Sequence, residues 1–206
     1  PIERLTEEGE ALGFGTLIKM PKFWLFILLM IGAGASEAGM AQWASAYVEA
    51  ALGFPKAVGD IAGPCLFAVA MGLSRAIYGK FGEKIDLKKF MLASGVLCLG
   101  CYLAAALCTV PIIGLLGCIV CGFSVGILWP GTISVASRAL PQGGTALFAL
   151  LAMGGDMGAS VGPGLVGVVT QAVDNNMKAG MLAGCIFPVI IIVAIGKMFL
   201  KSKAHK

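Results

Sequence analysis

Six long apolar segments constrain this chain more than any other feature of its sequence. Each has the roughly 20 residues that a helix needs to cross about 30 Å of hydrocarbon. Only 13% of the residues are charged and the mean hydropathy is +0.92, whereas about a quarter of the residues in a soluble domain are charged. The sequence therefore predicts an all-α integral membrane protein with six transmembrane helices. The expected spans are residues 23–47, 58–79, 90–109, 112–137, 145–170 and 179–200.

The lysines and arginines indicate how these spans are oriented. Six spans put both ends of the chain on one side of the membrane, and basic residues favour the cytoplasmic side. Of the 15 Lys and Arg residues, all but Lys56 and Lys178 fall on the side that holds the termini. We therefore predict a multi-pass protein of the plasma membrane with both termini cytoplasmic. The net charge of +4 then reflects this orientation and does not indicate nucleic-acid binding.

The two ends of the chain differ from the six-helix domain expected over residues 21–200. Residues 1–20 open with several glutamates, followed by an apolar stretch that fits a short amphipathic segment on the membrane surface. We interpret them as a cytoplasmic linker from an earlier domain, and the chain, which starts at Pro1, as a fragment or a processed product. Residues 201–206 are expected to form a basic cytoplasmic tail.

Two patterns that suggest chemistry in soluble proteins have simpler explanations here. Cys98 and Cys101, with Cys118 and Cys121, give two CxxC pairs at a zinc-like spacing. Both pairs lie inside apolar spans that lack the charged and hydrogen-bonding surroundings of a zinc site. They can face each other at a similar depth, and we interpret them as packing residues with no metal.

The pattern GFSVG around Ser124 matches the nucleophile elbow of serine hydrolases. A catalytic serine needs a base within hydrogen-bond reach, and the chain's one histidine, His205, lies in the tail. The pattern also falls in the middle of a helix, where small residues favour helix packing. We therefore expect neither an enzyme nor a cofactor.

Two acidic residues lie deep inside the apolar spans, where a charge is costly and usually faces a cavity or a partner, whereas Asp60 lies near the outer end of the second span. Asp156 lies about eleven residues into its span, near the midplane, and Glu37 lies about fourteen residues into the first span, past the middle. We expect both to line a cavity. The alternative is a buried structural hydrogen bond to a neighbouring helix.

Polar and aromatic residues follow Glu37 along the first span. Helical spacing brings Gln42 and Ser45 within reach of the face that carries Glu37, with Trp43 and Tyr47 beside it. Carboxylate, amide, indole and phenol groups together suit a polyhydroxylated solute. The alternative for the aromatic residues is anchoring at the membrane interface, which fits Tyr47 better than Trp43. The predicted solute-binding residues are Glu37, Gln42, Trp43, Tyr47, Asp156 and Ser160.

Glycines surround Asp156 in the fifth span. Gly154, Gly158 and Gly162 are four residues apart and share one face of a helix, where a second helix can approach closely. Gly162 and Pro163 together offer a bend. These features suit a moving gate, and equally a tight static bundle.

The loop between the second and third spans resembles the major facilitator superfamily signature G-x-L-x-D-R-x-G-R-K. It reads GKFGEKIDLK, and Gly79, Glu83, Lys84 and Lys88 fall on the Gly, Asp, Arg and final basic positions. Asp86 stands in place of the second Gly, so the charge network there must differ in detail. Residues 154–167 resemble the glycine-proline helix motif of the same superfamily.

This resemblance covers about residues 15–200 and implies the C-terminal six-helix half of a transporter. The missing partner would be an N-terminal six-helix half. The segment 37–47, together with Asp156, most resembles fucose-permease-like sugar transporters. The implied mechanism is alternating access, in which two halves rock around a site at the midplane. A sugar-like solute and a proton as coupling ion follow from the same likeness, with the main proton-carrying sites in the missing half.

The resemblance also implies cytoplasmic charge pairs around Glu83 that break and re-form between states. The alternative for the basic residues is simple anchoring on the cytoplasmic side. Two other functions stay open at this point. One is a six-span protein that pairs with itself to build the same cavity, and the other is a membrane sensor or scaffold without transport. The predicted gating residues are Arg75, Gly79, Glu83, Lys84, Lys88 and Arg138.

Overall fold

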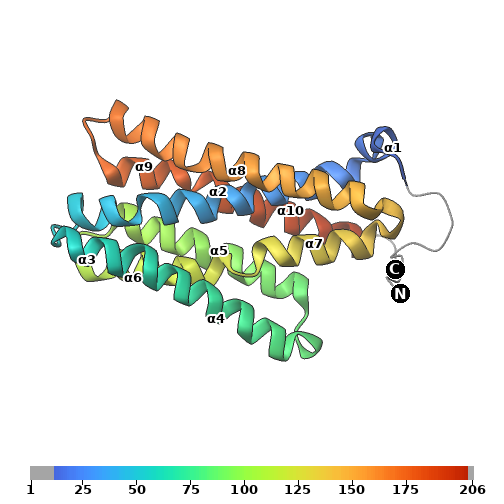
Figure 1. Ribbon diagram of the computed structural model, residues 1–206, viewed down its shortest axis with the longest axis horizontal. Coiled ribbons are helices and arrows are strands. Elements are labelled where there is room, and N and C mark those ends of the chain that lie inside the picture. The colour runs from blue at the N-terminus through green and yellow to red at the C-terminus, as the bar shows by residue number, and fades with distance from the viewer. Residues whose placement is uncertain (1–11, 204–206) are drawn as a thin grey trace.

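The computed structural model describes residues 12–203, and this part of the chain is helical without any strand. The helices run roughly side by side as one elongated bundle (Figure 1). In chain order the elements are α1 (Phe14–Lys19), α2 (Pro21–Ala50), α3 (Lys56–Asp60), η1 (Ile61–Cys65), α4 (Leu66–Phe81), η2 (Gly82–Lys84), α5 (Leu87–Leu107), α6 (Pro111–Val125), α7 (Leu128–Ala139), η3 (Pro141–Gly143), α8 (Gly144–Ala172), α9 (Met177–Gly184) and α10 (Ile186–Lys203).

Six continuous helical stretches are long and apolar enough to cross a membrane, which confirms the predicted all-α membrane fold. Pro21 and Pro111 begin helices, as their lack of a backbone N–H favours. The last stretch continues as α10 to Lys203, beyond the expected end at residue 200. The spans are Pro21–Ala50, Lys56–Phe81, Leu87–Leu107, Pro111–Ala139, Pro141–Ala172 and Met177–Phe199.

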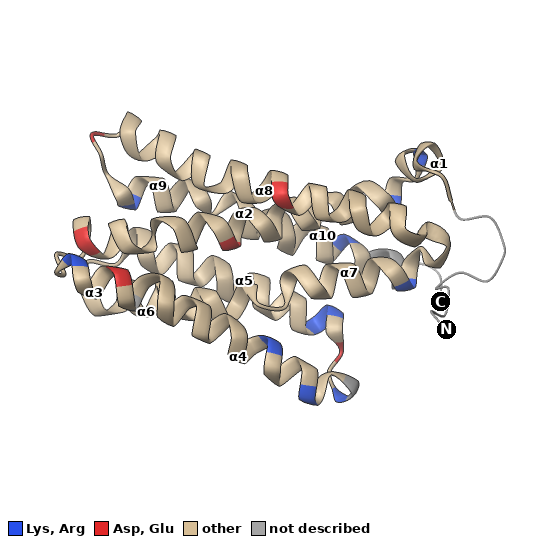
Figure 2. Cartoon of the chain, viewed as in Figure 1, with Lys and Arg blue, Asp and Glu red and all other residues tan. Residues whose placement is uncertain are grey.

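The two ends of the bundle differ in charge. One end, here called the lysine-rich end, is formed by α1, by the starts of α2 and α5, and by the final turns of α4, α7 and α10 (Figures 1 and 2). Lys56 and Lys178 lie at the opposite end, at the starts of α3 and α9. The structure thus separates the described lysines along the bundle as the sequence predicts, whereas Arg75 lies inside α4.

The short helix α1 is attached to the lysine-rich end. Leu17 is buried, and the indole Nε1 of Trp24 donates a hydrogen bond to the carbonyl oxygen of Ile18 at 2.7 Å. The backbone N–H of Leu12 donates to the carbonyl of Gln142 at 2.9 Å. The acidic start of the predicted linker and residues 204–206 of the tail lie outside the described residues.

A glycine seam joins α8 to α2. A Cβ atom added at Gly158 would overlap the carbonyl oxygen of Ile31, and one added at Gly162 would overlap that of Ala35. Gly154, on the same face, lies against Ile27. The two backbones are therefore in direct contact, as the four-residue glycine spacing predicts. The expected bend does not interrupt the helix, because α8 continues through Pro163.

The cysteine pairs and the GFSVG pattern lie where helices pack. Cys98 on α5 and Cys121 on α6 are buried with their Sγ atoms 3.9 Å apart. Ser124 is buried, and its hydroxyl donates to the carbonyl of Cys121 in its own helix at 2.7 Å. A Cβ at Gly122 would overlap the carbonyl oxygen of Phe67 on α4. The small residues of both patterns therefore bring neighbouring helices together.

Candidate functional site

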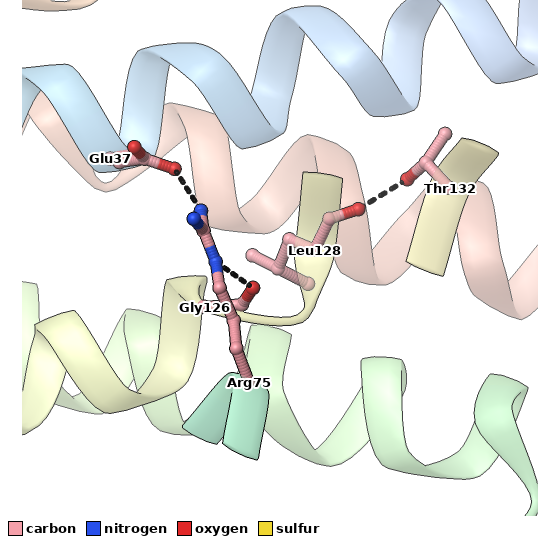
Figure 3. Close-up of polar contacts among 5 residues, drawn as sticks. All are labelled: Glu37, Arg75, Gly126, Leu128 and Thr132. Carbon is pink, nitrogen blue, oxygen red and sulfur yellow. Dashed lines mark hydrogen bonds and ion pairs between the residues drawn. The ribbon is translucent and has the colours of Figure 1, made fainter. Parts of the chain in front are cut away.

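The candidate site is built around an ion pair between α2 and α4. Nη2 of Arg75 lies 3.9 Å from Oε2 of Glu37, and Nε of Arg75 donates a hydrogen bond to the carbonyl oxygen of Gly126 at 3.0 Å (Figure 3). The Arg75 and Glu37 side chains are 47% and 28% exposed. One guanidinium group thus bridges three membrane-spanning segments on a face that the rest of the chain leaves open.

The sequence explains why the carbonyl of Gly126 is free to accept this bond. In a regular helix its partner would be the N–H of residue 130, and that residue is Pro130, which has none. The fourth span is accordingly divided into α6 and α7 around Gly126 and Ile127. A carbonyl without a helical partner is costly inside a membrane, and Arg75 satisfies it. A proline in the middle of an apolar span was the signal that could have revealed this acceptor.

The two least buried spans carry two charged residues of the site, Arg75 and Asp156, whereas Glu37 lies on the most buried span. In the apolar windows of the second and fifth spans, 24% and 28% of residues are buried, against 44–67% in the other four. Arg75 lies on the second span and Asp156 on the fifth. Charged groups inside a membrane face a cavity or a partner rather than lipid. This open face is therefore a candidate cavity wall.

Asp156 and Ser160 lie on the outward side of α8, away from the glycine seam. Both are exposed, with the exposed apolar residues Met153 and Met157 beside them. The hydroxyl of Ser160 donates to the carbonyl of Asp156 in the same helix at 3.0 Å. Among the described residues Asp156 forms no ion pair, so its carboxylate is available to a ligand or to a partner helix.

Gln42 and Trp43 follow Glu37 on α2 but have different surroundings. Gln42 is exposed, whereas Trp43 is half-buried. The indole Nε1 of Trp43 donates to the carbonyl oxygen of Pro163 on α8 at 2.9 Å. Trp43 therefore ties α2 to α8, and only part of its ring remains open. Further along, the hydroxyl of Ser45 donates to a carboxylate oxygen of Asp60, which ties α2 to α3.

Tyr47 lies apart from the other predicted solute-binding residues. Its side chain is completely buried, and its hydroxyl donates to the carbonyl of Ala105 on α5 at 2.5 Å. A side chain enclosed in this way contacts neither a solute nor the membrane interface in this conformation. Tyr47 therefore packs between helices, and we leave it out of the candidate site.

Comparison with known protein families identifies the class of protein. The model of the Major Facilitator Superfamily matches residues 2–163. The chain belongs to this superfamily. Its members are membrane transporters rather than enzymes, and they bind small-molecule solutes within a lipid bilayer. No curated protein and no solved structure matches the chain.

The loop that carries the superfamily signature lies at the lysine-rich end. Lys88 and Arg138 line one pocket of about 640 Å³ there, together with Asp86, which caps α5 by accepting hydrogen bonds from the N–H groups of Lys88 and Lys89. Asp86 thus acts as a helix cap at the position where the signature has its second glycine.

The remaining predicted gating residues are spread out. Lys84 is exposed in η2, and an added Cβ at Gly79 would meet no atom within 4 Å. The side chain of Glu83 lies outside the described part of the chain. Arg75, which is also among the predicted gating residues, lies inside α4 and pairs with Glu37.

The sequence analysis did not identify one aromatic residue that lies near Asp156. Trp129 on α7 is half-buried, and its ring lies where a Cβ at Gly155 would overlap it. Gly155 directly precedes Asp156, so an indole ring lies beside the turn of α8 that carries the acid. Its position next to Pro130 after the break in the fourth span is the sequence signal for it.

Proposed function

We propose that this chain is the C-terminal six-helix half of a secondary transporter that moves a small polar solute by alternating access. The solute class we favour is a sugar, with a proton as the coupling ion. The observation that carries the proposal is the partly exposed Glu37–Arg75 pair, which is bonded to the helix break at Gly126. Charged groups and an irregular backbone inside a membrane fit a solute pathway.

The distance between Glu37 and Arg75 is compatible with a solute that binds between the two side chains. At 3.9 Å the two charged groups attract each other, but they are too far apart for a good hydrogen bond. A hydroxyl group both donates and accepts, so a sugar can bridge the carboxylate and the guanidinium. Gln42 on α2 and Asp156 on α8 are further exposed polar groups in the membrane-spanning segments. The proton coupling rests on the resemblance to sugar symporters.

The open sides of α4 and α8 support a second six-helix unit opposite this wall. An N-terminal half of the same protein is the partner we propose, with the lysine-rich end in the cytoplasm. A second copy of this chain is the alternative that the same open faces allow. The intact mass of the native product distinguishes the two, because a species near 21.1 kDa would favour self-assembly.

The test is solute uptake by the intact protein in liposomes under an imposed pH gradient, with labelled monosaccharides as probes. We expect Glu37→Gln and Asp156→Asn each to lower uptake about tenfold or more with normal expression, because each removes a charge that faces the solute. Lys56→Gln, at the opposite end of the bundle, is the matched single-charge control. Normal uptake by both acid variants would refute the site, and no pH-driven uptake by the wild type would refute the function.

A further inference from the structure

A second groove, separate from the Glu37–Arg75 pair, opens at the lysine-rich end. Its volume is about 510 Å³, and it lies between the start of α2 and the ends of α7 and α10. Three lysines line it, each from a different helix: Lys22 on α2, Lys88 on α5 and Lys197 on α10. Its apolar lining includes Trp24, Leu25, Phe26, Leu28 and Met198.

The charge of this groove favours an anion. None of its described lining residues is acidic, and the three lysines form no ion pair with any described residue. The nearby acid Asp86 is already engaged by the backbone N–H groups at the start of α5 and by the ammonium group of Lys89 at 3.7 Å. Three lysines that line one groove without a carboxylate can be neutralised by a phosphate, which offers several acceptor oxygens.

The apolar lining favours a lipid over a free anion. Trp24 and Leu28 are one helical turn apart on α2 and are 50% and 47% exposed. The bond from Nε1 of Trp24 to Ile18 satisfies its polar group, so the exposed remainder of the ring is apolar. Tryptophan is typical of the headgroup level of a membrane. A soluble phosphate has no apolar part that could contact this surface, whereas the acyl chain of a lipid can cover it.

We propose that this groove binds one anionic phospholipid. Its phosphate lies among Lys22, Lys88 and Lys197, and an acyl chain follows Trp24 and Leu28 along α2. Basic pockets between transmembrane helices are known to hold anionic headgroups. The bound lipid links the first span to the last span through α10, and its binding does not depend on which solute the protein carries.

The test is binding of single lipids to the delipidated full-length protein, measured by native mass spectrometry. The probes are phosphatidylglycerol and phosphatidylcholine with identical acyl chains, and soluble glycerol phosphate. We expect phosphatidylglycerol to bind more tightly than phosphatidylcholine, and the double variant Lys22→Gln/Lys197→Gln to weaken its binding about tenfold or more, since each basic residue contributes about fivefold. The matched double control is Lys56→Gln/Lys80→Gln, which removes two charges outside the groove and should bind as the wild type does.

The apolar part of the site is tested separately with Leu28→Asn. This variant should weaken binding of phosphatidylglycerol, because it places an amide under the acyl chain. Glycerol phosphate bound as tightly as phosphatidylglycerol would show a soluble-phosphate site and overturn the lipid proposal. Equal binding of the two lipids, or equal weakening by both double variants, would overturn it as well.

Discussion

Helix α2 makes two contacts of opposite character. Toward α8 its backbone touches glycines directly, with no side chain between Ile31 and Gly158. Toward α4 the contact is made by the long side chains of Glu37 and Arg75, with 3.9 Å between their charged atoms. The α2–α8 contact is made by backbone atoms and has no side-chain rotamer to change. The α2–α4 contact can separate when the side chains of Glu37 and Arg75 rotate. From this comparison we predict that α2 and α8 move as one body and that rearrangement occurs on the α4 side.

The largest effect is expected from breaking the seam with Gly158→Leu. The new Cβ would overlap the carbonyl oxygen of Ile31, so the helices must separate. Forcing atoms into a packed contact costs about 1–3 kcal/mol, and sometimes more. We expect the unfolding temperature in scanning fluorimetry to fall by several degrees. Gly164→Leu is the matched control, because an added Cβ there meets no atom within 4 Å. Equal unfolding temperatures for the two variants would show that the seam is not tight.

The next effect is expected at the α4 contact and concerns transport more than stability. Arg75→Gln should lower solute uptake about tenfold, because it leaves Glu37 unpaired and frees the carbonyl of Gly126. In a double-mutant cycle with Glu37→Gln, groups that interact show non-additive effects. We therefore expect the double variant to lose less uptake than the product of the two single losses. Losses that simply multiply would show that the two side chains act independently.

A smaller effect is expected from Trp43→Phe, which keeps an aromatic ring but removes the hydrogen bond to Pro163. Losing one such bond costs about 1 kcal/mol. The free energy of unfolding should fall by about that amount if Trp43 belongs to the rigid α2–α8 unit. An unchanged unfolding curve would mean that this bond adds nothing to the seam.

The smallest effect is expected from Ser160→Ala. Its hydroxyl bonds within its own helix, to the carbonyl of Asp156, and the side chain is exposed. Surface changes of this kind usually alter stability by less than about 0.5 kcal/mol. Ser160 is a predicted solute-binding residue whose hydroxyl is already bonded within its own helix, so uptake should fall less than in Asp156→Asn. A loss of uptake equal to that of Asp156→Asn would show that Ser160 contributes to solute binding as much as the acid does.

The sequence by itself determined the features that depend on one helix at a time. Hydropathy is a property of a single segment, so the six spans follow from it directly. Once the spans are placed, the positions of the lysines between them show that most lysines lie at one end of the bundle. The spacing of Gly154, Gly158 and Gly162 predicts a close contact because every fourth residue shares a helical face. The loop from Gly79 to Lys88 indicates the superfamily that the family match then confirms.

Only the tertiary structure decided which side chains of different helices meet. Tyr47 belongs to the same stretch of α2 as Glu37, yet the rotation of that helix buries it against α5. The sequence groups Arg75 with the predicted gating residues, but the approach of α4 to α2 and the missing N–H of Pro130 give it two partners inside the membrane. The helical period fixes which residues share a face. The rotation and depth of the neighbouring helices decide what that face meets, and these depend on packing across the whole bundle.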